Sequence, residues 1–571
     1  MLKSRPTETF LSIALALLTL LFCISLFKNL SYPLLWCDEG DTAMFASRVL
    51  EYGYPKVHDG KNVLYVDDAD MKLGVRENSD FFIATPVFGY YWAAPGVFLA
   101  KFFDDFYTKT LILRLPFALT GLLGLIVFAL IPFRIYQWNS YKRLWFLVLF
   151  VLMELLSISL ILQLRDMRRY SMLILFTGGI FYLYTRRRIL KDKILTFGLY
   201  SFIVAVLLFL IFISFYPLFF ILIATLGLHE CLILVRDFRS ARKMGRTLRL
   251  FTSENLKPFF PLVISVLLVL PPIFFFRIFE NASFEAGGFH LMKHIALLLD
   301  VLRFLRIKEF LLLALFMKAA LIAAIFWGRW QDGSLPEAVA RQIRVSNFLT
   351  LFFVIHLIVI ARMPDVWTRF FIVLQPVLTL ILLLDGFAAF ELLGTAGTFP
   401  FSKKIKWGFV FLASLVFCIN CSSQIEDIRG HIYELTHRYK GPLDFVIPYI
   451  KANYKNTEDL VIATNYEEHC YMYYLASKVV IGCVGNNLKE DMQTTPDIII
   501  YRHGVPKMEP YLTQLRRKAQ YKAISFPVSD YLVNNVPELY FIVRHLYRTP
   551  VDLPSFEPLS IYVKVEAPGE K

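Results

Sequence analysis

About eleven apolar runs, each near the length that crosses the hydrocarbon core of a bilayer, constrain the fold of this chain. The first covers 10–27, and the others cover 111–133, 144–164, 170–184, 194–213, 215–235, 259–276, 310–327, 345–361, 370–384 and 405–421. Of the 571 residues, 57% are hydrophobic and only 19% are charged, which excludes a soluble globular protein. We therefore expect a polytopic α-helical membrane protein.

The net charge of +14 is explained by the loops between these runs and requires no nucleic-acid partner. Lys3 and Arg5 precede the first run, so the positive-inside rule places the N-terminus in the cytoplasm. The basic loops at 134–143, 186–193, 236–249, 329–344 and 403–406 then fall on the same side. An odd number of spans leaves residues 422–571 outside, beyond a membrane domain of residues 1–421.

The first external loop, residues 28–110, is long and carries two expected helices. Residues 41–52 alternate apolar and charged positions with helical spacing, which predicts an amphipathic helix. Residues 86–103 are apolar enough to span, but Pro95 interrupts them, and another span would move every later basic loop outside. We expect this segment to lie along the membrane interface.

The pattern changes to that of an α/β domain in residues 422–571. Short β-rich runs predict strands at 460–464, 479–483, 497–501 and 521–526, with helices at 467–476 and 508–518. No glycine-rich phosphate loop follows these strands, so nucleotide binding is unsupported. The seven cysteines match no zinc-site spacing, and Cys470 and Cys483 either pair in an oxidising compartment or stay reduced.

An acidic cluster, Asp38, Glu39 and Asp41, directly follows the first span. In one interpretation Asp38 is the N-cap of the amphipathic helix, and the helix dipole favours Asp41 in its first turn. In the other, a carboxylate at the membrane surface, where a low dielectric raises its pKa, takes a proton from a hydroxyl group. Spacing alone leaves both open.

Arginines cluster on the outer side, where the positive-inside rule does not expect them. Arg165, Arg168 and Arg169 lie just before Tyr170, and further arginines lie at Arg114, Arg362 and Arg369. Such side chains either extend along the membrane interface or hold phosphate oxygens, whose geometry suits a guanidinium group. Several of them around one acidic loop suggest an anionic, lipid-linked substrate.

The order of these motifs resembles that of the GT-C membrane glycosyltransferases, especially the dolichyl-phosphate-mannose protein mannosyltransferases and the bacterial aminoarabinose lipid A transferases. The matching segments are Asp38-Glu39-Gly40-Asp41 with the helix after it, Asp59-Gly60-Lys61, Thr85-Pro86 through Trp92, Arg114-Leu115-Pro116, Arg165 with Arg169-Tyr170, and Arg369-Phe370-Phe371 through Pro376. The acidic stretch 66–82 and the domain after residue 421 have no counterpart in this pattern.

The resemblance implies a GT-C-like fold of about eleven spans and inverting transfer of a sugar from a polyprenyl-phosphate donor to a lipid, glycan or protein hydroxyl. It implies that Asp38 is the general base and that Glu39 orients a substrate. It places Asp41, Lys61, Arg165, Arg169, Tyr170 and Arg369 in substrate binding. No metal is assigned, although the three acidic residues have the chemistry to hold a divalent cation.

Two other classes of function stay open at this point. A transporter or flippase of a lipid-linked anion also requires charged groups in a membrane, but no internal repeat is visible. A non-catalytic scaffold whose external domain binds a partner is the third.

Overall fold

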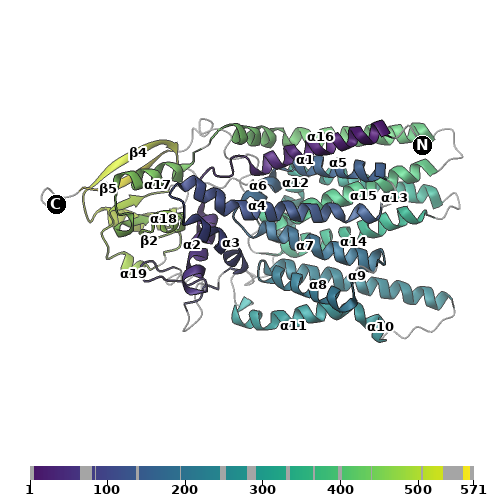
Figure 1. Ribbon diagram of the computed structural model, residues 1–571, viewed down its shortest axis with the longest axis horizontal. Helices are drawn as coiled ribbons and strands as arrows, with labels where there is room; N and C mark the ends of the chain where they lie inside the picture. The colour runs from purple at the N-terminus through teal and green to yellow at the C-terminus, as the bar shows by residue number, and fades with distance from the viewer. Residues whose placement is uncertain are drawn as a thin grey trace.

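The computed structural model describes residues 5–64, 80–83, 85–136, 140–192, 195–244, 252–278, 291–329, 335–363, 367–395, 402–438, 440–485, 487–502, 506–530 and 557–565. A bundle of helices forms one part of the molecule, and a small sheet with short helices covers one end of the bundle (Figure 1). The N-terminus lies at the other end, away from the sheet.

Seven helical segments among the described residues are long and apolar enough to cross a membrane. The helices that form them are α1 (Arg5–Phe27), α4 (Phe106–Leu130), α9 (Tyr216–Lys243), α10 (Ser253–Leu256) with η3 (Lys257–Phe259) and α11 (Phe260–Phe275), α14 (Glu337–Ile360), α15 (Leu374–Thr395) and α16 (Ser402–Thr436). The chain is therefore built as a multi-pass membrane protein.

Two further spans result if each of two bent helix pairs crosses as one unit. These pairs are α5 (Ser140–Leu156) with α6 (Ile158–Arg165), bent by 74°, and α12 (Leu291–Lys308) with α13 (Leu311–Arg329), bent by 91°. The shorter apolar helices are α7 (Tyr170–Tyr184) and α8 (Phe197–Phe212). Each expected apolar run lies on one of these helices, and the count of eleven spans stays a prediction.

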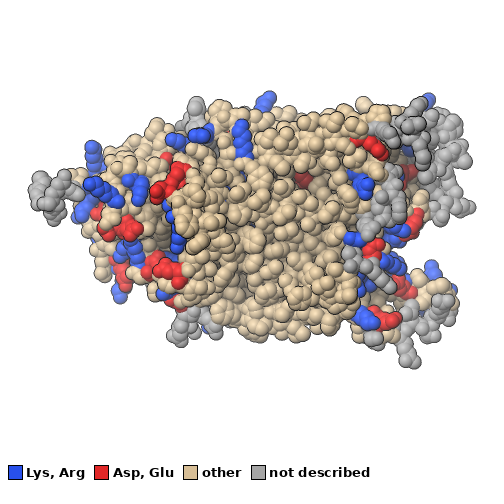
Figure 2. Space-filling model, viewed as in Figure 1, with Lys and Arg blue, Asp and Glu red and all other residues tan. Residues whose placement is uncertain are grey.

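Charged side chains gather at the two ends of the molecule and are scarce across the belt between them (Figure 2). The belt is lined by exposed leucine, isoleucine and phenylalanine side chains of the long helices, such as Leu17, Leu123 and Phe274. Such a surface is unfavourable in water and suits the hydrocarbon core of a bilayer.

The amphipathic helix between α1 and α4, α2 (Cys37–Tyr52), starts four residues before the expected residue 41. Trp36 is its N-cap, and Glu39 Oε2 accepts a hydrogen bond from the Trp36 N–H at 3.4 Å. The interpretation of Asp38 as the N-cap is therefore wrong, because Asp38 lies inside the first turn and Glu39 provides the acceptor. Residues 88–100 of the segment expected along the interface form the helix α3 (Phe88–Ala100), with Pro95 inside it, and its place at the membrane interface stays a prediction.

The C-terminal sheet has the strand order β2-β1-β3-β5-β4. Its strands are β1 (Val461–Thr464), β2 (Lys478–Ile481), β3 (Ile498–Ile500), β4 (Tyr521–Ser529) and β5 (Pro558–Lys564). The first three are parallel, and β5 pairs antiparallel with both β3 and β4. The four expected strands form, and β5 was not expected.

The short elements complete the connections. They are η1 (Pro132–Arg134), the π-helical turn η2 (Thr185–Ile189), η5 (Thr368–Phe371), α17 (Pro442–Asn453), η6 (Thr457–Asp459), α18 (Glu468–Leu475), α19 (Leu488–Asp491), η7 (Pro506–Met508) and α20 (Glu509–Arg516). Helix α16 continues past residue 421, because Asn420, Gln424 and Asp427 on it bind the end of α12. No disulfide bond links Cys470 and Cys483 in the structure.

The sheet domain packs directly on the start of α2. Gly40 lies so close to α18 that a Cβ at position 40 would overlap Cys470 Sγ. Asn62 extends the contact to the edge of the sheet, where its Oδ1 accepts the Val479 N–H at 2.7 Å. The segment between α1 and α4 therefore holds the C-terminal domain against α2, which carries the acidic cluster.

Candidate functional site

Asp38 and Asp41 lie one helical turn apart on α2 and share one arginine. Arg168, in the turn between α6 and α7, places Nη2 at 3.2 Å from Asp38 Oδ2 and Nη1 at 3.7 Å from Asp41 Oδ2. Arg168 Nη1 also donates to the Asp38 backbone oxygen at 2.6 Å. The tight turn before α7 and the first turn of α2 thus fix each other.

A second arginine reaches Asp38 from a distant part of the chain. Arg369, in η5, places Nη1 at 3.1 Å from Asp38 Oδ2. Its guanidinium group lies 4.8 Å from the ring centre of Trp367 and 5.9 Å from that of Trp36. These aromatic faces stabilise the cation and orient its planar group towards Asp38.

A third arginine, Arg169, forms no ion pair with a carboxylate within the described part of the chain, although its charge also lowers the pKa of Asp38. Its guanidinium group lies against the rings of Phe215, at 5.5 Å, and Tyr170, at 6.0 Å. Burial lowers the pKa of Arg169, and the like charges of Arg168 and Arg369 contribute in the same direction. A buried cluster of three guanidinium groups is expected to attract an anion.

The arginines also set the electrostatics of Asp38. Burial raises the pKa of Asp38, but the guanidinium groups, led by those of Arg168 and Arg369, outweigh burial and hold this pKa below its usual value. The Asp38 side chain is 25% exposed, against 14% for Asp41 and 0% for Glu39. Asp38 is therefore the ionised carboxylate of the cluster that a substrate reaches most easily.

Asp41 has a different environment, which includes the C-terminal domain. Tyr90 of α3 donates its hydroxyl hydrogen to Asp41 Oδ2 at 3.0 Å, and His469 of α18 places Nε2 at 3.9 Å from Asp41 Oδ1. Burial raises the pKa of Asp41 above its usual value, although His469 and Arg168 oppose this effect. The two aspartates thus have pKa values shifted in opposite directions.

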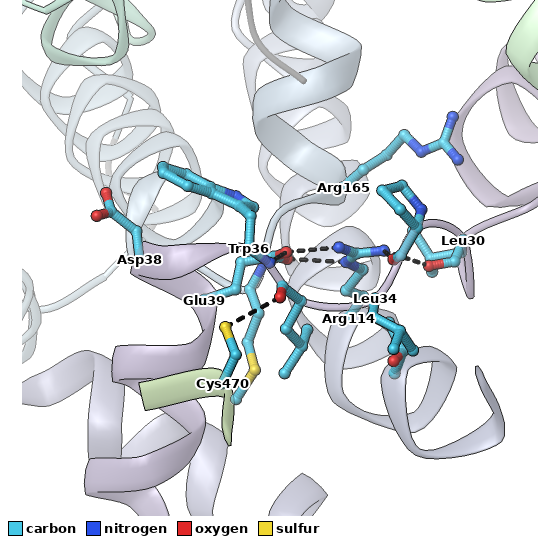
Figure 3. Close-up of polar contacts among 12 residues, drawn as sticks. Leu30, Leu34, Trp36, Asp38, Glu39, Arg114, Arg165 and Cys470 are labelled. Atoms are coloured by element: carbon cyan, nitrogen blue, oxygen red, sulfur yellow. Dashed lines mark hydrogen bonds and ion pairs between the residues drawn. The ribbon is translucent and has the colours of Figure 1, made fainter. Parts of the chain in front are cut away.

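Glu39 points away from Asp38 and into the protein (Figure 3). Its two carboxylate oxygens accept hydrogen bonds from Arg114, at 2.8 Å from Nε and 2.5 Å from Nη2, and the Met167 N–H donates to Oε1 at 2.8 Å. Arg114 in turn donates to the backbone oxygens of Leu30 and Pro33. In these contacts Glu39 fastens α2 to α4 and to the turn before α7.

Two other residues assigned to substrate binding from the sequence lie away from Asp38. The Arg165 side chain extends in another direction (Figure 3), with Nη2 at 3.3 Å from Glu434 Oε1 of α16. Lys61 Nζ donates to the backbone oxygens of Ala476, at 2.7 Å, and Glu458. Both side chains link parts of the fold to each other.

The structure brings together Asp38, Asp41, Arg169, Tyr170 and Arg369 from the expected set. Tyr170 is 1% exposed and contributes mainly its ring, beside Arg169. Three further residues contact the aspartates directly and are outside the set that the resemblance implies: Arg168, Tyr90 and His469. Arg168 was visible in the basic cluster, whereas nothing in the sequence linked His469, more than four hundred positions away, to Asp41.

The described residues contain no group of three or more His, Cys, Asp or Glu side chains arranged to hold a metal ion. The oxygens of Asp38 face two guanidinium groups, and this surrounding positive charge disfavours a cation. The divalent ion considered from the sequence does not fit these side chains, and no reaction step is assigned to it.

No protein-family profile matches the sequence, and no curated protein matches it. Among solved structures, ArnT from Cupriavidus metallidurans in the apo state is similar, with a TM-score of 0.50, 13% identity and 98% of each chain covered. ArnT bound to undecaprenyl phosphate gives a TM-score of 0.48 and 12% identity, over 97% of this chain and 98% of that chain.

The archaeal oligosaccharyltransferase AglB from Archaeoglobus fulgidus, in complex with an inhibitory peptide and a dolichol-phosphate, gives a TM-score of 0.49 and 10% identity. The match covers 87% of this chain and 70% of that chain. At these identities the likeness to apo ArnT shows a shared fold. It confirms the expected fold class, a GT-C-like helical membrane domain followed by a small extra domain with a sheet.

Proposed function

We propose that this protein transfers a sugar from a polyprenyl-phosphate-linked donor to a hydroxyl group at the membrane surface. The observation that carries this proposal is the cluster of Arg168, Arg169 and Arg369 beside Asp38 and Asp41. The phosphate of a sugar donor requires an anion site, and a hydroxyl acceptor requires an accessible carboxylate as the base. The cluster places both next to each other. The motif order and the GT-C-like fold support the same reaction class.

The arginines bind the phosphate of the donor. As the bond between the anomeric carbon and the phosphate oxygen breaks, its electron pair stays on the phosphate, which leaves with one more negative charge. The guanidinium groups stabilise this charge where it develops. Arg169 is the member of the cluster that is not already paired with a carboxylate, so it offers the phosphate the most uncompensated charge.

Asp38 acts as the general base. It touches both Arg168 and Arg369, so a phosphate on these groups places the anomeric carbon close to its carboxylate. The acceptor hydroxyl gives its proton to Asp38, and its oxygen bonds to the anomeric carbon on the face opposite the phosphate, with inversion. When the phosphate shares the two guanidinium groups, Asp38 loses part of their stabilisation and becomes more basic.

Asp41, Tyr90 and His469 bind the acceptor in this proposal. They lie one turn of α2 beyond Asp38 and include a hydrogen-bond donor, an acceptor and an imidazole ring. The C-terminal domain provides His469 and therefore takes part in acceptor recognition. Glu39 is a positioning residue, because its carboxylate is enclosed by Arg114 and the Met167 N–H.

A direct assay compares the wild type with Asp38→Asn in detergent or liposomes. Polyprenyl-phosphate hexose and pentose donors, radiolabelled in the sugar, are supplied with a membrane lipid extract as acceptor, and released or transferred label is measured. Asp38→Asn should lower turnover by about 100-fold or more, the size of a general-base contribution. Asp104→Asn, an exposed aspartate of the same external loop, is the matched control.

Undiminished transfer by Asp38→Asn would rule out Asp38 as the base. No transfer or hydrolysis of any donor by the wild type, together with movement of intact labelled lipid between leaflets, would instead identify a flippase.

A further inference from the structure

A second polar region lies at the end of the bundle away from the sheet. A cleft of 840 Å³ lies there between three parts of the chain: α9, α14, and the turn η2 with the residues after it. The end of the molecule opposite the sheet is hollowed between two lobes, with Lys and Arg side chains around the hollow (Figure 2). The 15 residues of α7 separate η2 from Arg169, and an α-helix rises about 1.5 Å per residue. The cleft therefore lies roughly 20 Å from the site at Asp38 along the bundle.

Positive charge lines the rim of this cleft. The cationic side chains are Arg188, Lys191, Arg236, Arg341 and Arg344, and the one carboxylate in the lining is Glu337. Arg341 and Arg344 share Glu337, at 3.2 Å and 2.8 Å. Glu230 binds Arg188, and Asp237 lies beside Arg236, so the cations still outnumber the carboxylates five to three.

The walls of the cleft become mostly apolar towards the middle of the bundle, with His229, Asn347 and Thr350 as the polar residues among them. On α14 the lining passes from Glu337, Arg341 and Arg344 to Phe348, Leu351 and Val354, one to three turns further along the helix. On α9 it passes from Arg236 inward to Ile233 and Leu232. A soluble anion needs the cations alone, whereas an amphiphile with an anionic headgroup fits the cations and the apolar walls together.

We propose that this cleft binds the headgroup of an anionic phospholipid from the leaflet opposite the sugar-transfer site. The phosphate contacts Lys191 and Arg344 at the rim, and the start of an acyl chain lies against Phe348 and Leu351. The π-helical turn η2 supports the cleft, because it directs Arg188 to Glu230 and brings Lys191, the second residue after the turn, to the rim. Lipid binding in this cleft requires no sugar transfer at the other end of the bundle.

The test measures lipid binding to the full-length protein after delipidation in detergent, by native mass spectrometry. Dioleoyl phosphatidylglycerol should bind at least about tenfold more tightly than dioleoyl phosphatidylcholine, which has the same chains and no net charge. Lys191→Gln with Arg344→Gln should reduce this affinity on the order of tenfold, because both cations lie near the headgroup. Inorganic phosphate, the third probe, should not displace the lipid.

Arg242→Gln is the matched control. It removes one exposed arginine from the same helix end, on a face of α9 about 130° away from the cleft-lining residues. Equal binding of the two lipids, unchanged binding by the double variant, or displacement by inorganic phosphate would each overturn the proposal. If the double variant does not fold, Lys191→Gln alone, which changes an exposed side chain, gives the same comparison.

Discussion

At the scale of single residues, Arg165 and Arg169 carry the same charge, lie four positions apart and make different contacts. Arg165 forms a buried ion pair with Glu434 of α16. Arg169 packs on Phe215 and Tyr170 beside two other arginines. The first is a structural cation, and the second belongs to the proposed phosphate site.

Substitution by glutamine should separate these two roles. Arg169→Gln should raise the KM for the donor by about 10- to 100-fold, the worth of a hydrogen bond to a charged group, and leave the thermal midpoint near that of the wild type. Arg165→Gln should cost up to about 3–5 kcal/mol of stability, because it removes the ion pair of the buried Glu434, whose Oε2 still lies 3.4 Å from His431 Nδ1. Donor titrations and thermal unfolding measure the two effects. Equal KM changes in both variants would contradict the assignment.

The opposite pKa shifts of Asp38 and Asp41 predict opposite effects on stability. The ionised Asp41 carboxylate costs the folded protein free energy, because its folded pKa is raised by burial. This cost is present above that raised pKa and disappears below about pH 3.9, where the group is protonated in both states. Asp41→Asn should therefore match or exceed the thermal midpoint of the wild type at about pH 7, and the difference should vanish at acidic pH.

Asp38→Asn gives the contrasting result. The folded pKa of Asp38 is lowered, so its stabilising effect is present above the unfolded pKa and is lost as pH falls through the folded pKa. Its asparagine variant should unfold at a lower temperature than the wild type at about pH 7, since Arg168 and Arg369 lose their shared carboxylate. Identical pH profiles for the two variants would contradict this account.

The chemistry of the site could be predicted from the sequence better than its contacts. The roles of Asp38, Arg169 and Arg369 are implied by the resemblance, and the acidic loop and the outer arginines in one chain agree with it. Spacing could not show that Arg168 turns towards Asp38 while Arg165 turns away, because that depends on the break between α6 and α7. His469 was not selected because tertiary packing alone brings α18 to α2.

At the scale of elements, the contact between α2 and α18 depends on Gly40. Gly40→Ala should lower the thermal midpoint and reduce transfer, because the added methyl group meets Cys470 Sγ and lies 3.0 Å from the Cys470 backbone nitrogen. Cys470→Ala in the same chain should restore part of both losses. If the effects of the two substitutions on the thermal midpoint and on transfer simply add, residues 40 and 470 are not energetically coupled, which would contradict this contact.

Helix and strand boundaries were predictable where the apolar pattern is continuous. The apolar helices follow from the continuous apolar runs, and the first four strands from short β-rich runs. The start of α2 was placed too late, since the Glu39 side chain extends the helix back to Cys37. Helix α16 was ended too early, since Asn420, Gln424 and Asp427 are polar and yet buried against α12. Local sequence patterns do not show that these polar side chains bind α12.

At the scale of the whole molecule, the N-terminus and the C-terminal domain lie at opposite ends of the bundle (Figure 1). With Lys3 and Arg5 before the first span, we expect the N-terminus in the cytoplasm and the sheet domain outside. Protease added to intact cells should remove an epitope tag from the C-terminus and leave an N-terminal tag intact. Tags with equal accessibility would contradict this topology.

The measurement that tests the central claim most directly separates donor binding from sugar transfer in one preparation. Equilibrium binding of a labelled polyprenyl-phosphate sugar and its single-turnover transfer are compared for the wild type, Asp38→Asn and Arg169→Gln. Asp38→Asn should bind the donor as tightly as the wild type or more tightly, and transfer it about 100-fold more slowly or worse. Arg169→Gln should bind the donor more weakly by about tenfold or more. Wild-type transfer by Asp38→Asn, or wild-type binding by Arg169→Gln, would contradict the account.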